Sequence, residues 1–241
     1  MVELSVWLQI ALLTLGAGIT MSVGAALAGI ERIRPGWLED EFRHAVIAFG
    51  GGALLAAVAL VLVPEGIRSL SSSAVFGWFA AGGVAFMLLD RWLAAHGTSA
   101  SQLTAMLSDF VPEALALGAT FTVSRESGLL LAGIIALQNL PEGFNAYREL
   151  ALSTRYRGSR VVLAFALTAL LGPVAGLTGH FLLAGYDDVI ASIMLFAAGG
   201  ILYIIFQDIA PQVRLQNHWA PPLGAVAGFL LGVMGKLALG A

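Results

Sequence analysis

Residues 44–67 of the chain read HAVIAFGGGALLAAVALVLVPEGI. A transmembrane helix needs roughly 20 consecutive, mostly apolar residues. This stretch meets that requirement, and its one acidic or basic residue apart from His44 is Glu65, near its end. The stretch therefore predicts a helix that crosses a membrane, and its three consecutive glycines allow a neighbouring helix to approach closely.

Comparable apolar runs recur along the whole chain, and the polar connections between them are short. We place the predicted spans near residues 5–30, 44–67, 74–95, 103–123, 127–147, 160–184, 188–212 and 220–240. The sequence thus predicts an all-α, polytopic membrane protein with eight transmembrane helices, formed as a single transmembrane domain over residues 1–241.

The composition supports this prediction. Of the 241 residues, 59% are hydrophobic and 11% are charged, whereas a soluble domain has about 45–50% apolar and about 25% charged residues. So little charge cannot cover a water-facing surface, and the lipid bilayer is the expected partner. The net charge of −3 and the scattered basic residues argue against nucleic acid as a partner. The absence of cysteine excludes disulfides and thiolate metal ligands.

The arginines predict the orientation in the membrane, because cytoplasmic loops are enriched in Lys and Arg. With eight spans, both termini lie on one side, which holds Arg68 and Arg125, while Lys236 falls within the last span. The opposite side holds nine of the 12 basic residues: Arg32, Arg34, Arg43, Arg91, Arg148, Arg155, Arg157, Arg160 and Arg214. We therefore expect a multi-pass protein of the cell membrane with both termini outside the cytoplasm.

Two consecutive spans carry the same type of polar motif. The fourth contains LSDFVPE at residues 107–113 and the fifth contains QNLPEG at residues 138–143. Asp109 and Glu113 are separated by four residues, as are Gln138 and Glu142, and Asn139 precedes Glu142 by three. Residues at these spacings share one face of a helix. Each helix thus presents a polar face within an apolar segment.

Each motif contains a proline, three residues after Asp109 in the first and three residues after Gln138 in the second. Pro112 and Pro141 lack an amide hydrogen, so they free the carbonyls of Ser108 and Leu137. Two kinked helices that face each other would offer side-chain and backbone oxygens at one point, and helices broken near the middle of the membrane often form the ion sites of transporters.

A carboxylate at the centre of a membrane helix costs roughly 2.5–3.5 kcal/mol on insertion scales. These two spans contain the carboxylates of Asp109, Glu113 and Glu142 and no Lys or Arg. A bound divalent cation or protonation would offset the cost. The alternative interpretation is a set of neutral acids that bond to one another in the core of the bundle.

At these residues the sequence resembles the ZIP (Zrt/Irt-like) family of divalent-metal transporters. The QNLPEG stretch is similar to the family's fifth-helix Pro-Glu-Gly motif. Less specific similarities to the family lie in Phe49–Pro64, at Gly172-Pro173 and in Ala197–Pro211. The resemblance implies a ZIP-like bundle of eight helices and a divalent metal ion (Zn, Fe or Mn) as the substrate, with no organic cofactor. It also implies a homodimer and no enzymatic activity.

The sequence departs from the family pattern at several of these positions. Asp109 and Phe110 replace the family's His and Asn, Asn139 stands where an Asp or His is frequent, and Gly172 stands where the sixth helix has an acid or His. Phe110 and Gly172 offer no ligand atoms in their side chains. We therefore expect at most one metal site, with the ligands Asp109, Glu113, Gln138, Asn139 and Glu142. An all-oxygen shell of this kind suits Mn²⁺, Mg²⁺ or Ca²⁺ better than Zn²⁺, although the family favours zinc or iron.

Four further residues are candidates for the ion path. Glu65 and Lys236 lie near the outer ends of their spans, where they would meet at the external mouth and form a gate. Gln207 and Asp208 replace the family's His-Glu pair at the inner end of the seventh span, where a released ion would leave. Ordinary interfacial positions are the alternative interpretation for all four.

Two other functional classes compete with transport. The first is a ZIP-fold membrane protein that no longer transports metal and has a structural or regulatory role, which Phe110, Gly172 and Lys236 favour. The second is an intramembrane enzyme with paired carboxylates, which the lack of a nucleophile or His near the acids disfavours.

Overall fold

A computed structural model gives the structure of residues 4–30, 41–96, 100–153, 158–183, 185–213 and 219–239. At residues 93, 96, 100–109, 145, 149, 151–153 and 212 it describes the backbone alone. Every regular element within these ranges is a helix, which confirms the predicted all-α class.

The described helices form eight passes along the bundle, as predicted. The single-element passes are α1 (Val6–Ile30), α4 (Ser72–His96), α5 (Ala100–Val123), α6 (Arg125–Ser153) and α11 (Ala220–Leu239). The composite passes are α2 (Arg43–Ala57) with the π-helix η2 (Val58–Leu62) and α3 (Val63–Gly66), α7 (Gly158–Thr168) with α8 (Leu171–Leu183), and α9 (Asp187–Ile204) with the π-helix η3 (Ile205–Ile209) and α10 (Ala210–Val213).

Six of these passes are long and apolar enough to cross a membrane by length and composition alone. The other two are α5, whose described apolar part is Phe110–Val123, and α6. These are the helices that carry the paired polar motifs. The described apolar part of α5 is shorter than a span because the side chains before Phe110 lie outside the described residues.

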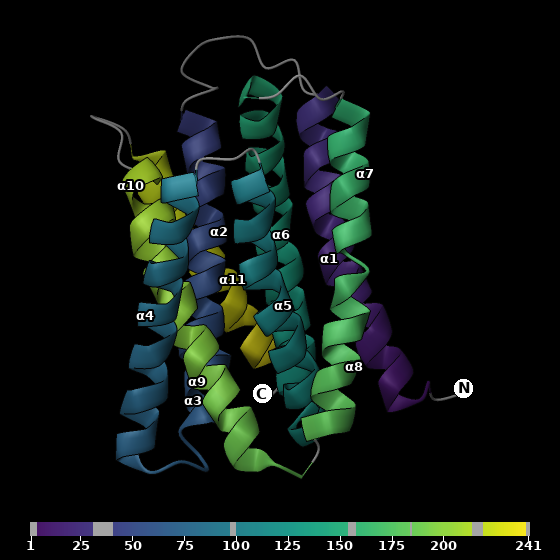
Figure 1. Cartoon of the computed structure of the whole chain (residues 1–241), viewed down its shortest axis with the longest axis vertical. Helices are drawn as coiled ribbons and strands as arrows, with labels where there is room; N and C mark the ends of the chain where they lie inside the picture. The colour runs from purple at the N-terminus through teal and green to yellow at the C-terminus, as the bar shows by residue number, and fades with distance from the viewer. Residues whose placement is uncertain are drawn as a thin grey trace.

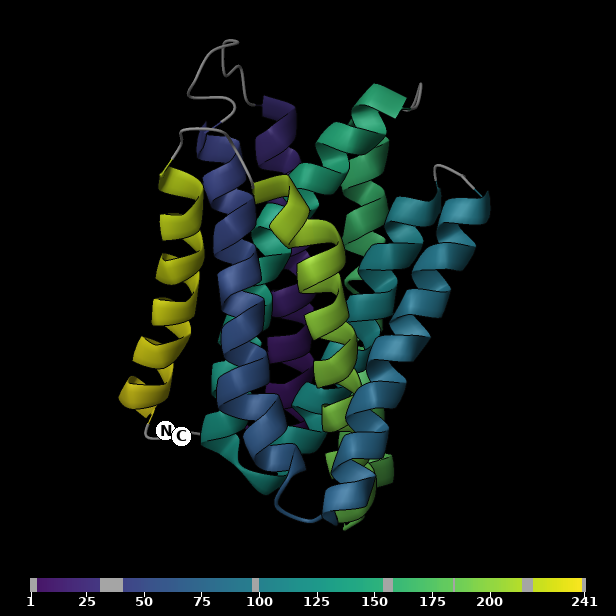
Figure 2. The same ribbon diagram turned by 90° about the vertical axis from the view of Figure 1, so that its left-hand side faces the viewer.

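The passes lie side by side along the long axis, with α5 and α6 in the middle of the view in Figure 1. The most extensive packing joins α1 to α6, α2 to α11, α4 to α9 and α5 to α8. Helix α1 begins and α11 ends at the same end of the bundle (Figures 1 and 2), which we call the terminal end. The α5–α6 connection also lies there, and the core between the passes is apolar.

Three consecutive glycines let α2 pack against three different elements. A side chain at Gly50 would meet Pro141 of α6, one at Gly51 would meet Ile209 of η3, and one at Gly52 would overlap the backbone of α11. The glycine run thus brings a neighbouring pass directly against the proline of the fifth-span motif.

The helical irregularities differ from those that the sequence predicts. Helices α5 and α6 continue through Pro112 and Pro141 without a break. Each helix tolerates the loss of one backbone hydrogen bond at its proline because the neighbouring turns keep theirs. The sixth pass is interrupted between α7 and α8, just before Pro173, as expected for its Gly-Pro pair. The two π-helices, each just before a proline, were not predicted.

Candidate metal site

The structure brings the two polar motifs into direct contact. The amide Nε2 of Gln138 on α6 donates a hydrogen bond of 2.6 Å to Glu113 Oε1 on α5. Glu113 is 3% exposed and Gln138 is fully buried. A short bond to a carboxylate in a buried setting is strong, so α5 and α6 are held together at this point.

Glu142 is the second carboxylate among the predicted ligands whose side chain the structure describes. It lies one turn after Gln138 on α6, is half-buried, and is close enough to Glu113 for the two carboxylates to interact electrostatically. Two like charges in a region of low dielectric repel each other strongly. The pair therefore needs a positive charge or protons beside it.

Asn139 connects the site to α1. Its Nδ2 donates a hydrogen bond of 2.9 Å to the carbonyl oxygen of Ala17, and the side chain is 1% exposed. This bond fixes the orientation of the amide, so that Nδ2 faces α1 and Oδ1 faces away from that bond.

Three acceptor oxygens at this place have no hydrogen-bond partner among the described residues. They are Glu113 Oε2, Gln138 Oε1 and Asn139 Oδ1, and all three are buried. An unsatisfied buried polar group costs about 1–3 kcal/mol, and more when it is charged. Most buried polar groups in native proteins are satisfied, so these acceptors without donors indicate a missing partner, such as a cation, a proton or a water molecule.

The side chain of Asp109 lies outside the described part of the structure, and only its helical backbone on α5 is given. Within the described residues, no three His, Cys, Asp or Glu side chains gather closely enough to hold a metal ion. The described site therefore combines two carboxylates with two amides.

The two departures at Phe110 and Gly172 lie against each other. The ring of Phe110 is fully buried, and its Cζ lies 2.7 Å from the place that a Cβ on Gly18 would take and 2.8 Å from the place that a Cβ on Gly172 would take. The ring thus fills the space that side chains at these two positions would need.

At the terminal end, Glu65 and Lys236 were predicted to meet each other, but each contacts other residues. Glu65 forms an ion pair of 2.6 Å with Arg68 and accepts a hydrogen bond of 3.1 Å from Ser127 of α6. Lys236 donates a hydrogen bond of 2.9 Å to the carbonyl oxygen of Leu60. Leu60 precedes Pro64 by four residues, so Lys236 replaces the donor that the proline lacks.

At the opposite end, Gln207 and Asp208 belong to η3 and are exposed. Close by in the chain, Tyr203 of α9 donates a hydrogen bond of 3.0 Å to Asp90 of α4. The sequence analysis did not single out Asp90, although an acid within an apolar span is itself a signal. It also missed Ser127, whose significance depends on a contact distant in sequence.

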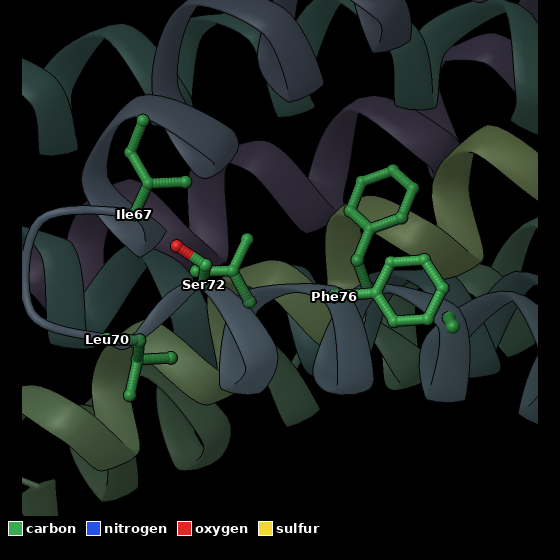
Figure 3. Close-up of a pocket in the computed structure, with 7 residues that line it drawn as sticks. Ile67, Leu70, Ser72 and Phe76 are labelled. Atoms are coloured by element: carbon green, nitrogen blue, oxygen red, sulfur yellow. The ribbon is translucent and has the colours of Figure 1, made fainter.

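A pocket of about 420 Å³ lies apart from these ligands, at the terminal end of α4 (Figure 3). Its lining is almost wholly apolar: Ile67, Leu70, Ser72, Val75, Phe76, Phe79 and Ala80. Such a lining offers no set of metal ligands, so the pocket is separate from the candidate site.

Comparisons with known proteins identify the family of the chain. The family model described as ZIP Zinc transporter matches residues 98–240, which include both polar motifs. The chain is 26% identical over 190 residues to the zinc transporter ZIP13 of Pongo abelii, a match that covers 70% of this chain and 58% of that protein. It is 31% identical over 134 residues to the zinc transporter ZIP11 of Homo sapiens, covering 51% of this chain and 39% of that protein. The matched part thus spans about half the length of these relatives. Because the family model matches more than half of an all-helical, eight-pass chain, the chain belongs to the ZIP zinc transporter family.

Proposed function

We propose that the protein transports a divalent metal cation through one intramembrane site, formed by Asp109, Glu113, Gln138, Asn139 and Glu142. The observation that carries this proposal is the group of three buried acceptor oxygens without donors on Glu113, Gln138 and Asn139. Membership of a family named for zinc transport supports the same function.

A water molecule would satisfy the hydrogen-bonding capacity of these oxygens but would leave the charge uncompensated. When both are ionised, Glu113 and Glu142 bring two negative charges into a buried region, and no Lys or Arg lies within residues 103–123 or 127–147. A divalent cation matches both the charge and the need for oxygen ligands. The neutral amides add ligands without adding charge, which favours release of the ion over permanent retention.

The ligand chemistry and the names of the relatives favour different ions. Carboxylate and amide oxygens suit Mn²⁺ and other hard cations, whereas Zn²⁺ in proteins is bound mostly by nitrogen and sulfur. The relatives are zinc transporters by name. We propose Mn²⁺ as the best-matched substrate within the zinc, iron and manganese group.

The direction of transport is towards the cytoplasm in this proposal. Nine of the 12 basic residues lie in or beside the connections opposite the terminal end, and basic connections are cytoplasmic. Both termini then face outward, Glu65 and Lys236 mark the external end, and the exposed Gln207 and Asp208 mark the exit. A homodimer, implied by the family resemblance, stays a prediction.

One alternative has a specific observation in its favour. The Phe110 ring occupies the space beside Gly172, and Lys236 bonds to a backbone carbonyl as a structural residue does. Both features fit a ZIP-fold protein that has lost transport and serves a structural or regulatory role.

Uptake by the purified protein in liposomes distinguishes the two. We expect liposomes that contain the protein to accumulate Mn²⁺ faster than empty liposomes, and Mn²⁺ to compete with Zn²⁺ at least as well as Zn²⁺ competes with itself. Radioactive or fluorescent metal inside the liposomes measures this. Uptake no faster than in empty liposomes would support the non-transporting alternative, and a clear preference for Zn²⁺ would contradict the assignment of Mn²⁺.

A further inference from the structure

The carboxylate of Glu65 joins two passes at the terminal end of the bundle. Glu65 lies on α3 and is 9% exposed. Its Oε2 accepts a bond of 2.6 Å from Arg68 Nη1, and its Oε1 accepts a bond of 3.1 Å from the hydroxyl of Ser127 on α6. The buried charge is therefore compensated from both sides, and one of its two bonds crosses from one pass to another.

Ser127 is itself held in place. It lies in the first turn of α6, its amide donates a bond of 3.1 Å to Ser124 Oγ, and its side chain is 6% exposed. The first turn of a helix carries a partial positive charge, which attracts an anion such as the Glu65 carboxylate. The Glu65–Ser127 contact thus combines a hydrogen bond with a favourable charge interaction.

The contact lies on the same face of α6 as the metal ligands. Ser127, Leu131 and Gln138 are related by four and then seven residues, which places them along one stripe of the helix. Leu131 is 1% exposed and Gln138 is fully buried. The stripe therefore leads from Glu65 to the site, and it is closed to water along its whole length.

The pass that carries Glu65 contains a point at which it can bend. The π-helix η2 (Val58–Leu62) directly precedes α3, and short π segments inside α-helices are frequent at functional sites. Lys236 of α11 holds the Leu60 carbonyl within η2. Helix α3 packs on α9, where a Cβ on Gly66 would lie 2.6 Å from Leu195 Cγ, and the Glu65–Ser127 bond joins it to α6.

We propose that the Glu65–Ser127 bond is a latch that keeps the terminal end of the ion path closed, and that its release exposes the stripe leading to the site. This inference rests on the proposed transport function for its meaning, because a latch matters only if an ion passes. The latch itself is a property of the fold that a measurement without metal can detect.

The chain contains no cysteine, so a single cysteine reports on one position without background. In the Leu131→Cys protein we would measure the rate of labelling by a membrane-impermeant maleimide, without metal, in intact cells and in inside-out vesicles. Glu65→Ala and Ser127→Ala are then added separately. Glu126→Gln is the matched control, because it removes an exposed carboxylate next to Ser127 and its glutamine oxygen can still accept the 3.5 Å hydrogen bond from Ser124 Oγ.

We expect Glu65→Ala and Ser127→Ala each to raise labelling from the terminal side about tenfold or more, since losing a hydrogen bond to a charged group shifts an equilibrium by at least that factor. Glu126→Gln should leave the rate unchanged. Labelling that is equally slow in all variants, or that rises in only one of the two latch variants, would overturn the latch. Size-exclusion profiles identify a variant that labels fast because it is misfolded.

The outcome separates the two proposals. Faster labelling together with absent metal uptake would leave the latch in place and contradict transport. Unchanged labelling together with normal uptake would overturn the latch and leave transport intact.

Discussion

Replacing Glu142 by alanine is expected to abolish metal uptake, with a loss greater than the roughly 10- to 100-fold effect typical of residues that only support metal ligands. Glu142 and Glu113 are the two described carboxylates of the site and interact with each other. With Glu142 gone, one carboxylate and two amides would face a divalent cation, and the charge match would be lost. Initial rates of Mn²⁺ uptake into liposomes measure the effect.

The matched control for Glu142→Ala is Glu126→Gln. Both residues lie on α6, but Glu126 is exposed at its first turn. We expect the control to transport like the unchanged protein. Near-normal uptake by Glu142→Ala would contradict the assignment of the site, and equal losses in both variants would point to a general defect of α6.

Divalent metal is expected to raise the thermal stability of the purified protein, and Glu113→Gln is expected to remove this gain. A ligand that binds only the folded state stabilises it by about 2.7 kcal/mol at a hundredfold excess over its Kd. Glutamine has the size of glutamate and lacks its charge, so the variant keeps the packing at Gln138 and loses the attraction for the cation. Melting curves with and without Mn²⁺ give the result.

Asp90→Asn is the control for this prediction. It also removes an acid from within a span, but Asp90 bonds to Tyr203 and not to the site residues. The control should keep its metal-dependent gain in stability. Stabilisation that persists in Glu113→Gln would show that the metal binds elsewhere, and no stabilisation of the unchanged protein would favour the non-transporting alternative.

The sequence predicted the passes and the pairing of the motifs because both depend on local periodicity. Recurring apolar runs placed the eight helices, and the spacing within each motif placed Glu113 and Gln138 on faces that meet. The family resemblance added the family itself, and the family model confirmed it over residues 98–240.

The partners of Glu65 and Lys236 could not be predicted in the same way. Both residues were expected to meet each other, yet Glu65 bonds to Arg68 and Ser127, and Lys236 bonds to Leu60. Such contacts depend on how helices distant in sequence are rotated against one another. Pro64 did carry a usable signal, because it leaves the Leu60 carbonyl without a donor and a nearby Lys can supply one.

The irregular segments show the same limit. The hydrophobic periodicity of the sequence does not predict the two π-helices, which depend on packing between passes. The break before Pro173, in contrast, followed from a Gly-Pro pair. The contact between Phe110 and Gly172 was also outside the reach of the sequence, although each residue had been noted as a departure from the family.

Crystals soaked in Mn²⁺ test the central claim most directly, because anomalous scattering locates the ion. We predict one strong peak between α5 and α6, at about 2.0–2.6 Å from oxygens of Glu113, Gln138 and Glu142, the range that hard divalent cations adopt. A map without a peak there, with Glu113 and Glu142 turned apart or bonded only to each other, would contradict it.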